Sequence, residues 1–200
     1  MDWMNDKELI AQIQGGNTNA FRFLVNQHRK LVWHMVLRMV RHHEDAEDIC
    51  QEVFIRVFKS MAKYRGDSKL STWIAAIAYN TCLDHLRKKG KAFVMHTDTL
   101  PESPTGSTSP STPWEELQRG EVKTIVHGII ENLPLHYRTV ITLFYLEEFS
   151  IQEIESITAM QEGTIKNYLH RGRKLIQEAV VTNFPEMARI AQPTNDNKLA

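Results

Sequence analysis

The chain has 200 residues, of which 42% are hydrophobic, as is ordinary for a globular protein of one or two domains. Its 24 lysines and arginines balance its 24 aspartates and glutamates, and this zero net charge argues against a protein that coats nucleic acid indiscriminately. The sequence has no apolar run of membrane-spanning length and no signal-peptide pattern at its start, so we expect a cytoplasmic protein without membrane insertion. Cys50 and Cys82 fall inside predicted helices, and we interpret both as core residues.

Helical periodicity dominates the first part of the chain, and no β-strand pattern is convincing anywhere in the sequence. The run Gly15-Gly16-Asn17 and the segment 64–69 contain residues that interrupt helices. We therefore predict a first domain over residues 1–90, with helices over residues 6–14, 20–40, 45–61 and 71–89.

The predicted helix at 45–61 has one apolar and one polar side. Ile49, Val53 and Val57 recur at helical spacing on the apolar side. Acids in a first helical turn are favoured by the helix dipole, which explains Asp45 but not Glu52, two turns further on. The polar side consists of Asp45, Asp48, Gln51 and Glu52.

The predicted helix at 71–89 divides in the same way. Its core side carries Ala75, Ala78, Tyr79, Cys82 and Leu86. An aromatic ring, an amide and cations on the other side suit single-stranded nucleic acid, since bases stack on rings and cations contact phosphates. Trp73 can equally pack against a neighbouring helix. We favour Asn80 and Arg87 as surface contacts, on a face made of Trp73, Ile77, Asn80, Asp84, Arg87 and Lys88.

The composition changes abruptly at residues 97–113, which hold four prolines among many serines and threonines. Such a segment cannot bury enough apolar surface to fold alone. We predict a flexible linker at 91–113, a second helical domain at 114–182 and a disordered tail at 183–200. Within the second domain one helix begins at Trp114 and another opens at Pro134, with its buried face formed by Tyr137, Val140, Ile141 and Phe144.

Residues 150–176 have the pattern of two short helices separated by a tight turn. Ser150 and Glu153 form an S-x-x-E capping box before an apolar stripe of Ile151, Ile154 and Ile157, and the turn is predicted at 158–160. The second helix starts near Glu162 and has an apolar side formed by Ile165, Leu169, Gly172 and Ile176. Its other side carries Lys166, His170, Arg173 and Lys174.

This arrangement is the helix-turn-helix that enters a DNA major groove, although a basic helix face can also be merely solvated. The sequence therefore predicts an all-α protein with two small helical domains joined by a flexible linker, the C-terminal one a helix-turn-helix.

Two stretches resemble a known family. The sequence DAEDICQEVF at 45–54, followed by YRGDSKLSTWIAAIAYNTCLDHLRKK at 64–89, resembles the second conserved region of sigma-70 family factors. The sequence at 133–176, which begins LPLHYRTVITLFYLEEFS, resembles their fourth region. With only these two regions in a short chain, the sequence is similar to an extracytoplasmic-function (group IV) sigma factor.

The resemblance implies a protein that binds core RNA polymerase and directs it to promoter DNA, in an extracytoplasmic stress or envelope response. The 45–54 helix would contact polymerase through Asp45, Asp48, Gln51 and Glu52. The 64–89 segment would recognise and melt the minus-ten element through Arg65, Lys69, Trp73, Asn80, Arg87 and Lys88. The helix from Glu162 would recognise the minus-thirty-five element through Thr164, Lys166, Asn167, His170, Arg171, Arg173 and Lys174.

The resemblance also implies a monomer when free of polymerase, and many relatives have an anti-sigma partner. Two positions depart from the family pattern. Relatives usually have a small residue where Glu155 stands and glycine where Ala159 stands. Glu155 would face a tight helix contact, and Ala159 stands where positive φ can be required. Either the turn is slightly remodelled or Glu155 points outward beside a cation.

Two other functions are weighed against this one. A stand-alone helix-turn-helix regulator would bind DNA without polymerase, but it needs neither the 45–54 nor the 64–89 motif. An enzyme or metal protein built on His42, His43, Glu44, Asp45 and Asp48 is disfavoured, because ligands crowded into one helix junction do not converge on a point. The sequence shows no nucleophile–base pair and no phosphate-binding glycine loop, so we expect no enzyme activity, metal or cofactor.

Overall fold

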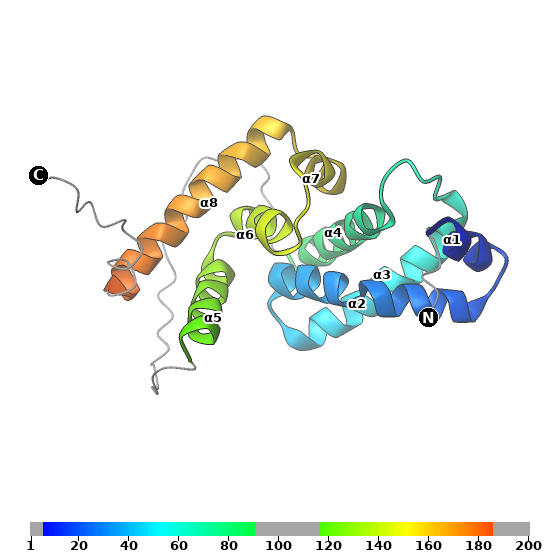
Figure 1. Ribbon diagram of the computed structural model, residues 1–200, viewed down its shortest axis with the longest axis horizontal. Helices are drawn as coiled ribbons and strands as arrows, with labels where there is room; N and C mark the ends of the chain where they lie inside the picture. The colour runs from blue at the N-terminus through cyan, green and yellow to red at the C-terminus, as the bar shows by residue number, and fades with distance from the viewer. Residues whose placement is uncertain (1–5, 91–116, 186–200) are drawn as a thin grey trace, which may run out of the picture.

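The computed structural model describes residues 6–90 and 117–185, and over those residues it is all-helical (Figure 1). The N-terminal half comprises α1 (Asp6–Gln14), α2 (Thr18–Val40), α3 (His43–Ser60), a 3₁₀ turn (Met61–Lys63) and α4 (Leu70–Lys88). The C-terminal half comprises α5 (Leu117–Asn132), α6 (Leu135–Ile141), a π-helical turn (Thr142–Leu146), α7 (Ile151–Thr158) and α8 (Glu162–Asn183). The predicted linker at 91–113, the start at Trp114 and the tail beyond 185 lie outside the described residues.

The predicted helices of the N-terminal half are confirmed, with ends shifted by one or two residues. α2 begins at Thr18 rather than at residue 20, because the Asn17 side chain accepts hydrogen bonds from the backbone N–H groups of Asn19 and Ala20. It ends where Arg41 takes a left-handed conformation (φ 70°) and its N–H returns to the Leu37 carbonyl. Local capping chemistry therefore defines this helix at both ends.

The core of the N-terminal half is aliphatic and comes from all four of its helices, with α2 packed against both α3 and α4 (Figure 1). Leu9, Leu24, Val53 and Ile74 have no exposed surface. Each such side chain contributes about 1.5–3 kcal/mol on burial. The predicted core side of α4 is confirmed, since Ala75, Ala78, Tyr79, Cys82 and Leu86 are all buried.

Both cysteines are free thiols, but only Cys82 is the core residue that was predicted. Cys82 is fully buried, and Cys50 is half-buried on α3. Burial raises the pKa of the Cys50 thiol to about 11, and burial raises the pKa of Cys82 as well. Neither thiol is therefore ionised near neutral pH.

In the C-terminal half, α6 packs against α8, and the chain between α6 and α7 widens into the π-helical turn. This turn makes one expectation wrong. Phe144 is only partly buried, whereas Leu143 is 1% exposed, because the wider π-helical repeat shifts which side chain faces the core. Tyr137, Val140 and Ile141 precede the turn and are buried as predicted.

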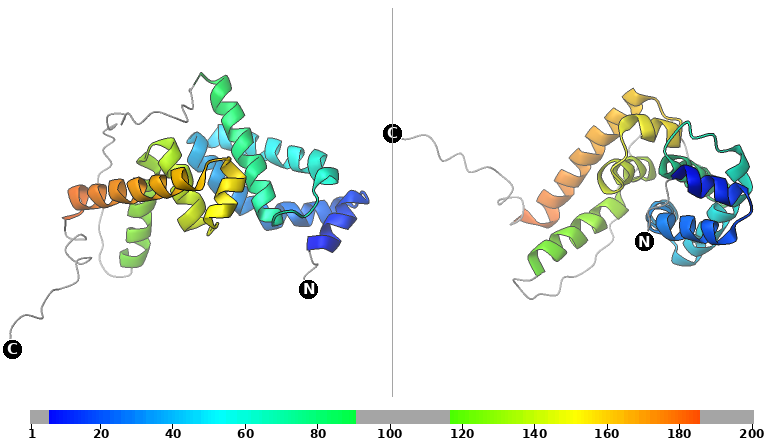
Figure 2. Two further views of the ribbon diagram at one scale, coloured as in Figure 1. Left: turned by 90° about the horizontal axis from the view of Figure 1, so that it is seen from above. Right: turned by 45° about the vertical axis from the view of Figure 1, so that its right-hand side comes forward.

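The two halves lie in contact with one another, with α7 beside α4 and α6 beside α2 (Figures 1 and 2). Arg138 of α6 joins them through its Nε, which donates to the Arg38 carbonyl at the end of α2. Its Nη1 also donates to the carbonyls of Glu131 (2.8 Å) and Leu133 (3.0 Å) at the end of α5. One guanidinium thus satisfies carbonyls that the ends of two helices leave unpaired.

Within residues 6–90 and 117–185, no helix is both long enough and apolar enough to cross a membrane.

Candidate functional site

The helix-turn-helix begins at the capping box that the sequence predicts. The Ser150 backbone N–H donates to Glu153 Oε2 (2.9 Å), and the Glu153 N–H donates back to Ser150 Oγ (3.3 Å). This reciprocal pair starts α7 at Ile151 and turns Ile154 and Ile157 into the core. The first helix of the motif is therefore positioned by its own sequence.

The two unusual positions of the turn are accommodated by a left-handed Ala159 and an outward Glu155. Ala159 is in the left-handed conformation (φ 57°), and its N–H donates to the Glu155 carbonyl at 2.8 Å. A non-glycine residue in that conformation costs about 1–2 kcal/mol. Glu155 itself is exposed, so it does not enter the contact between the two helices. The turn is retained, at some cost in stability, without the usual small residues.

α8 presents a basic face to solvent. Ile165, Leu169 and Gly172 are buried on its inner side. Two of its lysines form ion pairs with acids one turn away, Lys166 with Glu162 (2.5 Å) and Lys174 with Glu178 (3.8 Å). Such pairs are worth about 0.3–0.5 kcal/mol and break without moving a helix. Of the predicted contacts, Thr164 is half-buried, and the exposed ones are Lys166, Asn167, His170, Arg171, Arg173 and Lys174.

Gly172 sets how closely α8 approaches α6. A Cβ at this position would lie 2.9 Å from Ile141 Cγ1 and 3.1 Å from its Cδ1. The two helices therefore meet with no room for a side chain, and this contact holds α8 with its basic face outward.

The outer face of α4 is less open than that of α8. Trp73 is half-buried, and its ring packs on Tyr64 with centroids 5.0 Å apart. The Tyr64 hydroxyl in turn donates to the Ser68 carbonyl at 2.6 Å, which shapes the 64–69 loop. Both rings border a hollow that also includes the predicted contact Arg65. Trp73 thus packs on the loop and still faces a hollow.

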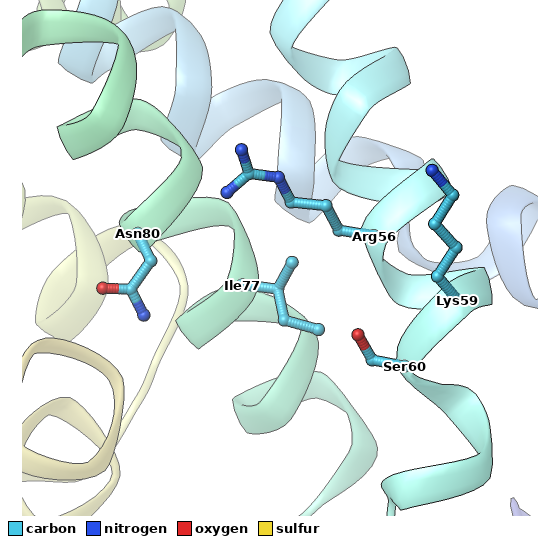
Figure 3. A pocket seen from close by; sticks show the side chains of 5 residues that line it. All are labelled: Arg56, Lys59, Ser60, Ile77 and Asn80. Carbon is cyan, nitrogen blue, oxygen red and sulfur yellow. The ribbon is translucent and has the colours of Figure 1, made fainter.

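Asn80 lies at a second hollow, of about 330 Å³, between α3 and α4 (Figure 3). Arg56 and Lys59 of α3 line it together with Ile77 of α4. Asn80 is exposed, and its amide donates to the Ala76 carbonyl one turn back (2.9 Å). Sequence reasoning missed Arg56 and Lys59. Arg56 follows Glu52 by about one helical turn and Lys59 by about two, and this spacing would have been the signal.

The polar side of α3 is only partly available to a partner. Asp48 and Gln51 are exposed. Asp45 accepts from Lys89 Nζ at 2.6 Å, a hydrogen bond that holds the pKa of its carboxyl below the usual range. Glu52 likewise accepts from Arg56 (2.8 Å), which lowers its pKa.

The cations around α4 differ in their surroundings. Arg56 continues from Glu52 to Asp84 of α4 (2.9 Å), and Arg87 approaches the same carboxylate at 4.0 Å. Lys88 is exposed at the end of α4. Lys69, just before α4, pairs with Glu153 of α7 at 3.0 Å. Among the described residues, no three His, Cys, Asp or Glu side chains are grouped so that they could hold a metal ion.

Two family models match this chain, sigma-70 region 2 over residues 24–92 and sigma-70 region 4 over residues 123–176. The ECF RNA polymerase sigma-E factor of Haemophilus influenzae is 31% identical over 183 residues, which is 88% of this chain and 96% of that protein. The chain belongs to the extracytoplasmic-function (ECF) sigma factors. The predicted family is confirmed.

Two other relatives support the assignment of this chain to the sigma factors. The sigma factor SigW of Bacillus subtilis is 31% identical over 86% of this chain and 95% of its own length. The sigma-H factor of Pseudomonas aeruginosa is 29% identical over 88% of this chain and 93% of its own length. Both are similar to the chain across both helical halves, which does not favour the stand-alone regulator.

Two solved structures share the fold. CnrH, in complex with the cytosolic domain of CnrY, has a TM-score of 0.61 at 18% identity and covers 87% of this chain and 96% of its own. RpoE of Bartonella quintana, in complex with the anti-sigma factor NepR, has a TM-score of 0.58 at 21% identity, with 79% and 94% covered. The predicted all-helical fold is confirmed.

Proposed function

We propose that this sigma factor, which directs transcription, uses three separate surfaces, each on a different helix. The exposed part of the α3 polar side, Asp48 and Gln51, would bind core RNA polymerase, with Asp45 and Glu52 joining once their internal partners are displaced. The outer face of α4 would bind the minus-ten element, and α8 would bind the minus-thirty-five element. The single observation that supports this division is that one chain carries a polar-aromatic face on α4 and a basic helix-turn-helix face on α8.

The chemistry of each DNA surface suits its element. Melting extrudes a base at a cost of a few kcal/mol, which stacking and hydrogen bonds to the extruded base can offset. The hollow beside Asn80, with Arg56 and Lys59, offers an amide for a base edge and cations for phosphates. On α8, Lys166, Asn167 and His170 lie near the start of a helix that can enter a major groove, with Arg173 and Lys174 further along for phosphates.

The proposal also covers where the protein acts, its oligomeric state and a further protein partner. It acts in the cytoplasm, as a monomer when free of polymerase and without catalytic activity of its own. Since RpoE of Bartonella quintana was solved with an anti-sigma factor, we also propose an anti-sigma partner for this chain. Residues 1–90 and 114–182 would be the two functional domains, joined by the segment 91–113.

Run-off transcription with core polymerase and a genomic fragment library tests the proposal. We expect initiation at discrete sites that share two spaced elements. DNA binding without initiation would instead support the stand-alone regulator.

Asn80→Ala tests the assignment of the minus-ten face. It should lower open-complex formation about tenfold, the cost of losing one good base contact, and leave polymerase binding unchanged. Asn132→Ala is the matched control, because Asn132 is also exposed and its amide also donates to a carbonyl one turn back, that of Gly128 at 3.0 Å. An equal loss of both polymerase binding and open complex in Asn80→Ala would refute the assignment.

A further inference from the structure

Arg56 joins two surfaces to which the proposed function gives different partners. From α3, its Nε donates to Glu52 Oε1 (2.8 Å), on the polar side proposed to bind polymerase. Its Nη1 donates to Asp84 Oδ2 (2.9 Å), on the outer face of α4 proposed to bind DNA. One guanidinium therefore contacts one acid of each surface.

Arg56 also borders the hollow beside Asn80. Its side chain extends from α3 toward α4, and it lines the hollow together with Lys59 and Ile77 (Figure 3). The Arg56 side chain is 36% exposed, and those of Glu52 and Asp84 are 47% and 44% exposed. Because all three groups reach solvent, their ion pairs can be exchanged for other partners at little cost.

The outer face of α4 carries an acid that contacts to phosphates do not explain. Asp84 follows Asn80 by about one helical turn, and its carboxylate repels DNA phosphates. Besides Arg56, Arg87 approaches it, with Nη1 at 4.0 Å from Asp84 Oδ1. A carboxylate in this place can hold two guanidiniums at the DNA face without contacting DNA itself.

The two acids differ in what polymerase binding does to them. Polymerase that engages Glu52 competes with Arg56 Nε for the same carboxylate, whereas Asp84 stays where it is on α4. The guanidinium is then held from the α4 side alone, next to the hollow, with an N–H donor to spare. A guanidinium suits phosphate oxygens, because its planar donors can form two parallel hydrogen bonds.

We propose that Arg56 is a further ligand of the minus-ten strand, which Glu52 restrains in the free sigma factor and which polymerase binding at Glu52 releases toward a DNA phosphate at the Asn80 hollow. This inference rests on the proposed roles of Glu52 and of the α4 face. Arg56 thereby couples polymerase binding to DNA binding, and a coupling of this kind acts equally in both directions. The strength of one exposed ion pair limits it to about two- to fivefold.

Glu52→Gln in the full chain removes the charge that restrains Arg56. Glu47→Gln is the matched control, because Glu47 is exposed on the same helix and its carboxylate also contacts a side chain four residues away, His43 at 3.4 Å. The double variant Glu52→Gln/Arg56→Gln shows whether a gain depends on Arg56, and its net charge equals that of the wild type.

Binding of a single strand in the absence of polymerase measures the release of Arg56. Fluorescence anisotropy with a labelled single-stranded DNA 12-mer of random sequence is recorded at several salt concentrations. We expect Glu52→Gln to bind about two- to fivefold more tightly than the wild type. One additional phosphate contact should also steepen the plot of log affinity against log salt by about 0.7. Glu47→Gln and the double variant should show neither change.

Arg56→Gln in the presence of core polymerase separates a DNA ligand from a merely structural residue. Glu52 no longer has to leave Arg56, so core polymerase should bind about two- to fivefold more tightly, while open-complex formation falls by a similar factor. A structural role of Arg56 would weaken both, since both surfaces would lose their support.

A loss of both polymerase binding and open complex in Arg56→Gln would overturn the proposal, as would a gain of Glu52→Gln that persists in the double variant. Asn80→Ala distinguishes this failure from that of the proposed function. Weaker 12-mer binding in Asn80→Ala, with no gain in Glu52→Gln, would overturn the release of Arg56 alone. No change in either variant would refute the minus-ten face itself.

Discussion

The two halves of the molecule are stabilised in different ways. Residues 6–90 close around many equivalent aliphatic side chains, among them Leu24, Val36 and Ile74, each fully buried. The C-terminal half also buries aliphatic side chains, such as Val140 and Ile165, but depends in addition on two positions that have no equivalent. Arg138 is 3% exposed and donates to three backbone carbonyls, and Gly172 permits the crossing of α6 and α8.

This difference in stabilisation determines how each half holds its functional surface in place. In the N-terminal half the polar surface is held by pairs between helices, such as Asp45 with Lys89, above a core that tolerates small changes. In the C-terminal half the approach of α8 to α6 depends on Gly172, and the place of α6 against α2 and α5 depends on Arg138. Substitutions should therefore have larger effects on stability in the C-terminal half and larger effects on binding in the N-terminal half.

Arg138→Met provides the strongest test of this difference. It removes the Arg138 donor from the Arg38 carbonyl and leaves the Glu131 and Leu133 carbonyls to Arg41 alone. We expect the C-terminal half to lose about 3 kcal/mol of stability. Hydrogen exchange should show that α6 and α8 lose protection while α3 and α4 keep it. Arg22→Met, an exposed arginine of α2, should change stability by less than about 0.5 kcal/mol. Uniform loss of protection over both halves would contradict the comparison, because the protein would then unfold as one unit.

Gly172→Leu should have the next largest effect. The new side chain meets Ile141 where even a Cβ would lie 2.9 Å away, and overpacking of this kind costs about 1–3 kcal/mol. Gly163→Leu is the control on the same helix, since a Cβ there meets nothing within 4 Å. Urea unfolding of the two variants should differ by about 2 kcal/mol or more. Equal midpoints would mean that α6 can move aside at little cost.

Much of the fold could be predicted from the sequence because its determinants are local. The capping box of Ser150 and Glu153 lies within four residues, and the core side of α4 follows from helical spacing. The π-helical turn could not be predicted, since the burial of Leu143 in place of Phe144 depends on what packs against the turn.

The candidate site was predictable only in part, for a related reason. The residue types and faces of α3, α4 and α8 follow from spacing, but pairing over long sequence distances does not. Lys89 lies 44 residues from Asp45, and Arg138 lies 100 residues from Arg38. The pair of Glu52 with Arg56 follows from a spacing of four residues in one helix. No local pattern says which partner Asp45 or Lys69 meets, so those two ion pairs become visible only once the helices are packed.

Asp48→Ala and Asp45→Ala test the binding side of the comparison. Asp48 is exposed, and its loss should weaken core polymerase binding about tenfold, equivalent to about 1.4 kcal/mol. Asp45 is bonded to Lys89 in the free protein, so its loss should weaken binding only about twofold. Titration of core polymerase with labelled variants at physiological salt measures both. Equal losses would mean that polymerase displaces Lys89 and uses both acids alike.

The smallest expected effect is a pH dependence at Glu153, where the two halves meet. The backbone N–H of Ser150, followed by Lys69, lowers the pKa of this carboxyl from 4.5 to about 2. The folded protein therefore binds this proton less readily than the unfolded chain does. The stabilisation by Glu153 is complete above pH 4.5 and is lost as the pH falls toward 2, by about 1 kcal/mol after screening by solvent. Urea unfolding at pH 7, 5, 4 and 3 should show a shallower acid-side decline for Glu153→Gln than for the wild type or Glu155→Gln. Parallel curves for all three would mean that Glu153 contributes no more at this junction than any exposed acid, and the coupling of the two halves would then rest on Arg138 and the packed helices alone.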